Sequence, residues 1–212
     1  MKKLILFISL LQVVNFSYSQ SQNKDVSDTF ESNNNEWPIT KETDRSAEIK
    51  GGYYILVNNS TEKELNVSCN KGADLRDLDF TIETTINTVK YKDIKYYGIR
   101  FGENTSNAVD FYISTNGKFA IQEYYNEEFH AMQEWTSSKA IREGKTTNTL
   151  KVIRKANHLQ FLVNGEVVYN CFEKIYFGHI TGFVVAPGIT IKADNLNTWT
   201  SKINIPTVAD PM

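Results

Sequence analysis

The sequence has 212 residues, of which 41% are hydrophobic and 12% aromatic, and its 23 basic and 25 acidic side chains give a net charge of −2. This length accommodates one medium-sized domain with its own core, and the aromatic content excludes a wholly disordered chain. The balanced charge excludes a protein that holds nucleic acid by bulk electrostatic attraction.

The first residues have the pattern of a signal peptide. Two lysines precede an apolar run at residues 4–11, and small residues stand at Ser17 and Ser19. This pattern predicts cleavage before Gln20, so that residues 1–19 direct export to the periplasm or the extracellular space. The alternative is a buried N-terminal helix. The apolar run is too short to span a bilayer, and no later segment is suited to a membrane span.

The body of the chain, residues 30–200, is predicted to be one domain of β-strands. Residues 20–29 are polar and predict a flexible lead-in, and residues 201–212 a C-terminal tail. The clearest strand is 78–86, where apolar and polar side chains alternate over nine positions. Residues 137–143 have the pattern of a short helical turn. The other predicted strands are residues 45–49, 52–57, 64–69, 94–101, 107–114, 118–125, 148–155, 158–164, 167–171, 181–186 and 189–194.

The turn at Asn116-Gly117 allows the register of one hairpin to be predicted. A three-residue loop pairs Phe111 with Ile121, so that both side chains enter the core. A two-residue loop would instead pair Phe111 with Gln122 on opposite faces. We therefore expect the three-residue loop, with Gly117 in the left-handed conformation. The turn at Asn164-Gly165 differs, because there a two-residue loop pairs Phe161 with Val168.

About a dozen short antiparallel strands in one domain predict an all-β fold of two stacked sheets, a β-sandwich or jelly roll. Strand parity then separates the side chains of the core from those of the outer faces. The positions predicted to point inward are Phe80, Ile82, Ile99, Phe101, Phe111, Ile113, Phe119, Ile121, Leu150, Val152, Leu159, Phe161, Val163 and Phe183.

A series of segments has a distinctive order: DFTIE at 79–83, YGIRFG at 97–102, FYISTNG at 111–117, WTSS at 135–138, NTLKV at 148–152 and LQFLVNG at 159–165. In this order they resemble the concanavalin A-like, laminin-G-type jelly roll of exported bacterial proteins. They are most similar to its branch of 3-keto-disaccharide hydrolase-like domains. The resemblance covers residues 30–199 and implies a two-sheet antiparallel jelly-roll β-sandwich. It rests on strand starts, core positions and a tight turn, so it supports the fold better than a function.

The outward positions predict a ligand-binding face of polar and aromatic side chains. A sugar offers hydroxyl groups to charged side chains and apolar C–H faces to aromatic rings. The alternatives are that Arg100 only forms an ion pair with Asp110 or Glu83, and that Trp135 closes one end of the core. The predicted ligand-binding residues are Glu83, Arg100, Asp110, Tyr112, Gln122, Tyr124 and Trp135.

Other chemistry has weaker support in the sequence. Cys69 and Cys171 are the only cysteines, and in an exported chain they would either form a disulfide or remain two thiols. No cofactor is indicated. Calcium is common in laminin-G-like domains, but no Asp/Asn spacing identifies a site for it. Jelly-roll glucanases carry their catalytic carboxylates as Glu-x-Asp-x-x-Glu on one strand, and this motif is missing from the sequence.

These observations favour an exported, non-catalytic jelly-roll domain that binds carbohydrate or another surface ligand through one sheet face. The first alternative is a glycoside-processing hydrolase, which rests on the resemblance alone. The second is a structural module whose partner is a surface protein, bound at a bare strand edge or an apolar patch.

Overall fold

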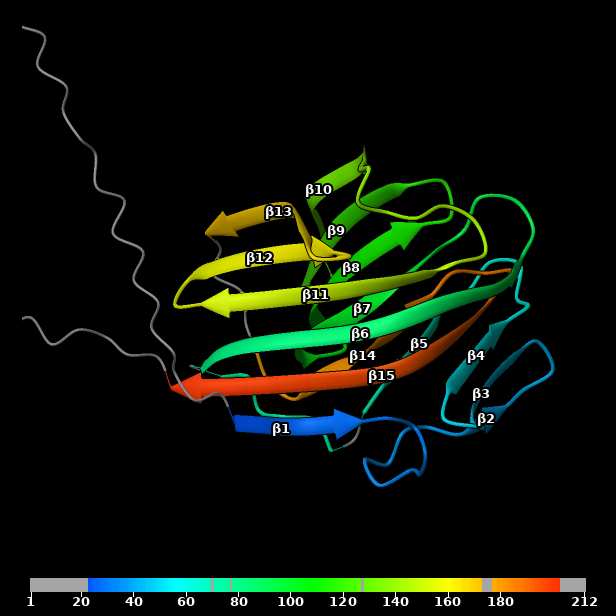
Figure 1. Ribbon diagram of the computed structural model, residues 1–212, viewed down its shortest axis with the longest axis horizontal. Helices are drawn as coiled ribbons and strands as arrows, with labels where there is room; N and C mark the ends of the chain where they lie inside the picture. The colour runs from blue at the N-terminus through cyan, green and yellow to red at the C-terminus, as the bar shows by residue number, and fades with distance from the viewer. Residues whose placement is uncertain (1–22, 70, 77, 127, 173–176, 203–212) are drawn as a thin grey trace, which may run out of the picture.

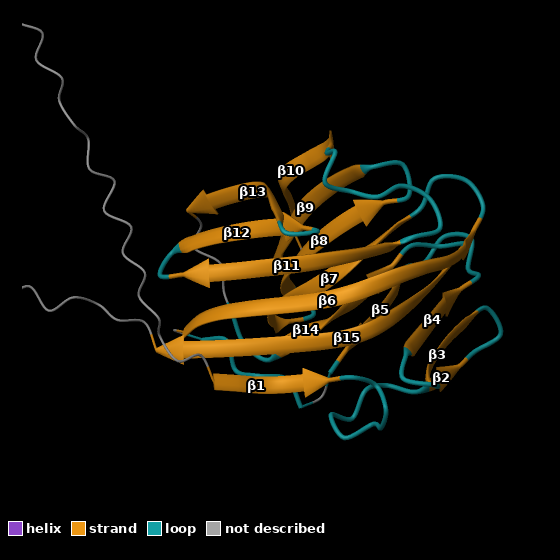
Figure 2. Ribbon diagram, viewed as in Figure 1, coloured by secondary structure: helices purple, strands orange, loops and turns teal. Residues whose placement is uncertain are grey.

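The computed structural model describes residues 23–69, 71–76, 78–126, 128–172 and 177–202, and every regular element in these residues is a β-strand (Figure 2). The strands form two antiparallel sheets packed face to face. The prediction of an all-β, two-sheet antiparallel jelly-roll sandwich is therefore confirmed.

Sheet A is the nine-stranded layer at the front of Figure 1. Its order is β13 (Glu166–Phe172), β12 (His158–Val163), β11 (Thr147–Lys155), β6 (Leu78–Tyr91), β15 (Ile189–Lys202), β4 (Tyr54–Asn58), β3 (Arg45–Ile49) and β2 (Thr40–Lys41), and β1 (Asn23–Asp28) also pairs with β15. Sheet B lies behind it, in the order β10 (Glu128–Ser137), β9 (Lys118–Tyr125), β8 (Asn107–Ser114), β7 (Tyr96–Asn104), β14 (Ile180–Val185) and β5 (Leu65–Ser68).

The core fills the space between the two sheets. All fourteen side chains that were predicted to point inward are buried in one continuous apolar cluster. Aromatic rings join the layers, since Phe111 of sheet B packs edge-on against Phe161 of sheet A at a centroid distance of 5.2 Å. Edge-on packing of this kind adds about 0.5–1.5 kcal/mol to the stabilisation from burial.

The N-terminal region differs from the flexible lead-in expected at residues 20–29, because residues 23–28 form β1 and pair with β15. Val26, Asp28 and Phe30 are all buried, so every second side chain of this polar segment points into the protein. The Asp28 carboxylate accepts hydrogen bonds from the Trp37 indole (2.6 Å) and from the Phe30 backbone N–H (2.7 Å). One buried carboxylate thus fixes the loop that follows β1.

The β8–β9 hairpin has the predicted register. Phe111 is paired with Ile121 and Ile113 with Phe119. Gly117 has a φ of +76°, the left-handed conformation that the three-residue loop requires.

The β12–β13 hairpin has the predicted two-residue loop, with Val163 opposite Glu166. The predicted pairing of Phe161 with Val168 is wrong, since Phe161 is paired with Tyr169. A bulge next to Phe161 inserts one residue into β13 and shifts the register, as bulges commonly do in edge strands.

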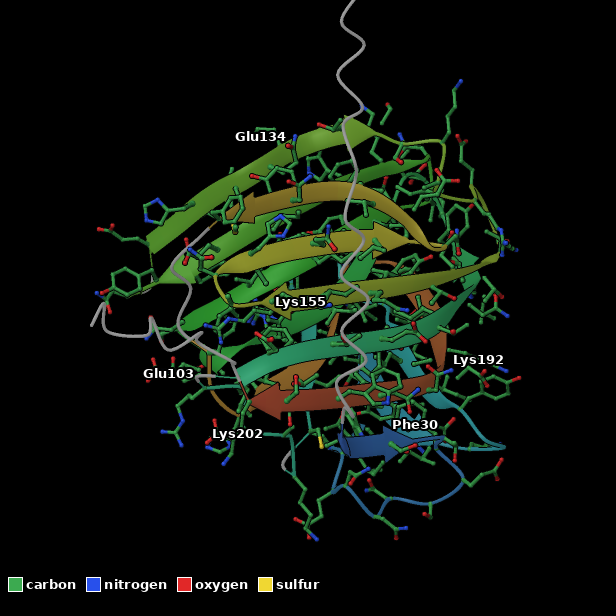
Figure 3. The ribbon with its side chains drawn as sticks, turned by 60° about the vertical axis from the view of Figure 1, so that its left-hand side comes forward. Phe30, Glu103, Glu134, Lys155, Lys192 and Lys202 are labelled. Carbon is green, nitrogen blue, oxygen red and sulfur yellow. The ribbon has the colours of Figure 1, made fainter. Side chains whose placement is uncertain are left out.

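Strand β10 was not among the predicted strands. It is an edge strand with most of its side chains exposed, so no burial alternation marks it in the sequence. Figure 3 labels Glu134 on this strand at one edge of the molecule, far from Phe30 at the other.

The helical turn expected at 137–143 is only partly realised: the last residue of β10 is followed by turns and bends.

Candidate functional site

The outer face of sheet B brings together six of the seven predicted site residues, five from β7, β8 and β9 and the sixth, Trp135, from β10. The registers place Arg100 of β7 opposite Asp110 of β8, which is opposite Gln122 of β9. Tyr112 and Tyr124 lie on the same face, two positions along their strands. Strand parity therefore predicted this face correctly for β7, β8 and β9.

At the centre of this face is a buried ion pair. The Arg100 guanidinium donates from Nε to Asp110 Oδ1 (2.7 Å) and from one terminal nitrogen to Asp110 Oδ2 (2.6 Å). The Tyr112 hydroxyl donates to Asp110 Oδ2 (2.7 Å). Asp110 is completely buried and Arg100 is only 9% exposed. Arg100 therefore forms the ion pair with Asp110 that the sequence analysis gave as an alternative to ligand binding. The hydrogen-bonding groups of the two side chains face one another rather than solvent.

The electrostatics of this network follow from its burial. Burial lowers the pKa of Arg100, but the hydrogen bonds and the charge of Asp110 outweigh that effect and raise it. Burial, together with the charge of Asp110, also raises the pKa of the Tyr112 hydroxyl. Arg100 therefore remains a cation and Tyr112 a neutral hydrogen-bond donor.

Aromatic rings cover the ion pair from outside. Tyr96 packs edge-on against Tyr112 with a centroid distance of 5.1 Å, and Trp135 lies 5.6 Å from Tyr96 and 6.1 Å from Tyr112. On the other side, the Arg100 guanidinium lies 5.3 Å from the centre of the Tyr124 ring. Tyr124 thus lies directly beside the ion pair, whereas Tyr96 and Trp135 pack on Tyr112.

Trp135 reaches this position because of an irregularity in β10. Gln133 is opposite Ile121 and Thr136 is opposite Phe119, so two residues of β10 face the single Ala120 of β9. Such bulges redirect side chains. The small Ala120 also leaves room beside Tyr112 for the indole. Trp135 therefore lies over the outer face and remains 37% exposed, rather than closing the end of the core.

Next to Tyr96 and Trp135 is a pocket of about 340 Å³. Ile94, Tyr96 and Trp135 form its apolar wall, and Ser114, Asn116 and Lys118 form its polar side. The polar side is built on the β8–β9 turn, where the Ser114 hydroxyl donates to Asn116 Oδ1 (2.7 Å) and accepts from the Lys118 backbone N–H (3.1 Å). The turn therefore fixes the polar groups beside the Trp135 ring.

A second pocket, of about 440 Å³, lies on the other side of the same turn. It shares Asn116 with the first pocket and is more polar. Its remaining lining residues are Gly117, Ser137, Ser138, Lys139, Ile141 and Glu143. The two pockets flank the turn, so a chain-like ligand can contact both.

The sequence prediction missed most of the first pocket. Tyr96 and Ser114 are on the same outward parity as Arg100 and Tyr112 and could have been found in this way. Asn116 and Lys118 were assigned only to a turn and a strand start. Their position beside Trp135 depends on the bulge in β10, for which the sequence carries no clear signal.

The placement of Glu83 with this face is wrong. Glu83 points outward as predicted, but β6 belongs to sheet A, where Glu83 is paired with Lys151 of β11 in an ion pair. The chain crosses between the sheets after β6. Strand parity shows which side chains point outward, whereas it does not show to which sheet a strand belongs.

The sulfur atoms of Cys69 and Cys171 are not bonded to each other. Cys69 follows β5 at one edge of sheet B, and Cys171 belongs to β13 at the edge of sheet A next to β10.

Across the described residues, no three His, Cys, Asp or Glu side chains are grouped so as to hold a metal ion. In the same residues, no helix is long and apolar enough to cross a membrane.

No protein-family model and no curated protein matches the chain. Solved structures do match it. The carbohydrate-binding module CBM66 from Bacillus subtilis has a TM-score of 0.57 and 14% identity, over 83% of this chain and 96% of that one. The exoplasmic/lumenal domain of VIP36, in a form bound to Ca²⁺ and Man3GlcNAc, has a TM-score of 0.65 and 8% identity, over 89% and 93%.

A β-glucanase from Bacillus licheniformis is also similar, with a TM-score of 0.61 and 10% identity over 86% of this chain and all of that one. At such low identities the likeness concerns the fold alone. The fold is that of the concanavalin A-like jelly rolls, as the resemblance in the sequence implied. The more specific likeness to 3-keto-disaccharide hydrolase-like domains stays a prediction.

Proposed function

We propose that this chain is an exported carbohydrate-binding domain and that a sugar ring binds in the pocket against Trp135. The observation that carries the proposal is the partly exposed Trp135 ring, held by Tyr96 and Tyr112 beside the polar side chains of the β8–β9 turn. An aromatic ring suits the C–H face of a sugar, and adjacent polar groups suit its hydroxyls. The carbohydrate-binding module CBM66 and the Man3GlcNAc-bound VIP36 domain among the similar structures support the same proposal.

In this proposal the predicted site residues on sheet B have three different roles. Arg100, Asp110 and Tyr112 are buried and bonded to one another, so they support the face rather than contact the ligand. Trp135 contacts the sugar, together with Tyr96, Asn116 and Lys118. Gln122 and Tyr124 are partly exposed and border the face.

The proposed role is binding without catalysis. Most glycosidases use two carboxyl groups separated by about 5–10 Å. The residues that line the Trp135 pocket include no Asp or Glu, and Glu143 is the one carboxylate among those that line the adjoining pocket. A hydrolase remains the alternative because a β-glucanase has a similar fold. Release of cleaved products from a bound glycan would favour it.

A glycan array followed by calorimetric titration of each bound glycan tests the proposal, with and without calcium. Trp135→Ala should lower affinity at least tenfold, about 1.4 kcal/mol or more. The matched control is Phe172→Ala, which removes another exposed aromatic ring, 72% exposed, from sheet A. Equal affinity in a folded Trp135→Ala variant would exclude the pocket. If no glycan binds, a protein partner becomes the better proposal.

Export is tested separately. Mass spectrometry of the protein secreted by its natural host should find an N-terminus at Gln20. A mature protein that retains residues 1–19 would contradict this part of the proposal.

A further inference from the structure

The polar side of the Trp135 pocket offers unused hydrogen-bond donors and a positive charge. The Asn116 Oδ1 already accepts one hydrogen bond from Ser114, whereas the Asn116 Nδ2 donates to no group of the described residues. Lys118 contributes an ammonium group, which forms no ion pair with the carboxylates of the described residues. A site with these groups has hydrogen-bond donors and one positive charge that no carboxylate of the described residues pairs with.

Neither Glu64 nor Glu143 lines this pocket. Glu64 accepts a hydrogen bond from the Tyr96 hydroxyl at 2.9 Å, at the end of the ring whose side forms the pocket wall. Glu143 lines the adjoining pocket, and Lys139 lines that pocket with it. Lys118 is therefore the one charged side chain among the residues that line the Trp135 pocket.

A neutral sugar and an anionic sugar make different demands on such a site. Each hydroxyl of a neutral sugar both donates and accepts, so it is bound best where acceptors are also available. A carboxylate or sulfate only accepts, and its hydrogen bonds to an ammonium are roughly twice as strong as neutral ones. The donors beside Trp135 match the second kind of ligand.

Resting on the proposed function, we propose that the pocket selects a sugar that carries an anionic group, either the carboxylate of a uronic acid or a sulfate ester. The anionic group binds Lys118 and the Asn116 amide while the sugar ring packs against Trp135. Lys118 is then the residue that determines specificity, and Trp135 contributes affinity for any sugar of suitable shape.

The test compares each anionic oligosaccharide with its neutral form. The probes are galacturonate and glucuronate oligosaccharides with their methyl esters, and galactose sulfate oligosaccharides with their desulfated forms. We expect the anionic form of at least one pair to bind at least tenfold more tightly. Lys118→Met should abolish this preference, because it removes the charge and keeps most of the length of the side chain. Raising the NaCl concentration from 50 to 500 mM should weaken binding of the anionic form only.

Lys155→Met is the matched control, since it removes one positive charge from an exposed position of β11 on sheet A. It should change affinity less than twofold. Equal losses in both lysine variants would overturn the inference, because attraction would then be non-specific. Trp135-dependent binding of the neutral forms with no preference for charge would overturn it while supporting carbohydrate binding. Absence of binding to every member of both series and to the glycan array would overturn the proposed function itself.

Discussion

Arg100 on β7 and Asp110 on β8 stand directly opposite one another and share two hydrogen bonds, at 2.7 and 2.6 Å, on the outer face of a sheet. Outer faces normally contact water, yet Asp110 is completely buried. The ring of Tyr124 lies beside the Arg100 guanidinium, and Tyr96 and Trp135 pack on Tyr112, whose hydroxyl donates to Asp110. Each charge is therefore compensated mainly by its partner, and the stability of the face depends on both.

The first prediction concerns this dependence. Asp110→Asn should destabilise the protein by about 3–5 kcal/mol, because it leaves the Arg100 charge buried without a counter-charge. The free energy of unfolding, from urea titration, measures the effect. The control is Glu83→Gln, which breaks the ion pair with Lys151 on sheet A, where both side chains are about a third exposed. That change should cost at most about 1 kcal/mol. Similar losses in the two variants would contradict the burial argument.

The second prediction concerns Glu64 and pH. Burial raises the pKa of Glu64, and the hydrogen bond from Tyr96 offsets only part of the increase. The native state therefore favours the protonated acid more than the unfolded state does. The stability that this contributes is fully present below the unfolded pKa of about 4.3 and is lost as pH rises through the higher native pKa.

Glu64→Gln has no titrating group and can still accept the Tyr96 hydrogen bond. Its stability relative to the parent protein should increase between pH 4 and pH 7. Urea titrations at several pH values measure the difference. A constant difference across this range would mean that Glu64 titrates alike in both states.

Strands with one buried and one exposed face are the part of this fold that the sequence predicts well. Phe111 and Ile113 alternate with Asp110 and Tyr112, and this pattern predicts both the strand and the register of its hairpin. Strand β10 has no such pattern because most of its side chains are exposed. Alternation of polarity requires a buried face, so an exposed edge strand has little to mark it.

The candidate site depends on information that strand parity does not contain. Parity correctly predicted the outward direction of Arg100, Asp110 and Glu83, but the last belongs to the other sheet. It also gave no sign that Asp110 is buried, since that burial depends on side chains of neighbouring strands such as Arg100. Sheet assignment and covering rings are long-range properties, and a local pattern cannot specify them.

The third prediction concerns the cysteines. Burial raises the pKa of the Cys69 thiol to about 11, and the thiol donates a hydrogen bond to the backbone oxygen of Asn35. At pH 8 only about one molecule in a thousand has the reactive thiolate at this position. Iodoacetamide should therefore label Cys69 in urea and leave it unmodified in the native protein, as read by mass spectrometry of the digested peptides. A disulfide to Cys171 would instead protect both residues until a reductant is added.

The fourth prediction separates the two roles of Tyr96. Its hydroxyl donates to Glu64, whereas its ring packs against Trp135 and forms part of the pocket wall. Tyr96→Phe keeps the ring and loses the hydrogen bond. It should therefore bind glycan within about twofold of the parent protein. It should also be less stable at pH 7 by about 1.5–3 kcal/mol, the usual contribution of a hydrogen bond to a charged group.

Tyr96→Ala also removes the ring, so the indole of Trp135 loses the neighbour that holds it over the pocket. Affinity should then fall at least tenfold, in parallel with Trp135→Ala. Calorimetric titration of the same glycan against both Tyr96 variants and the parent protein measures these affinities. Equal affinity in folded Tyr96→Phe and Tyr96→Ala would show that the ring does not shape the site. A large loss in Tyr96→Phe alone would mean that the hydroxyl contacts the ligand directly, and the pocket would then have an additional polar group.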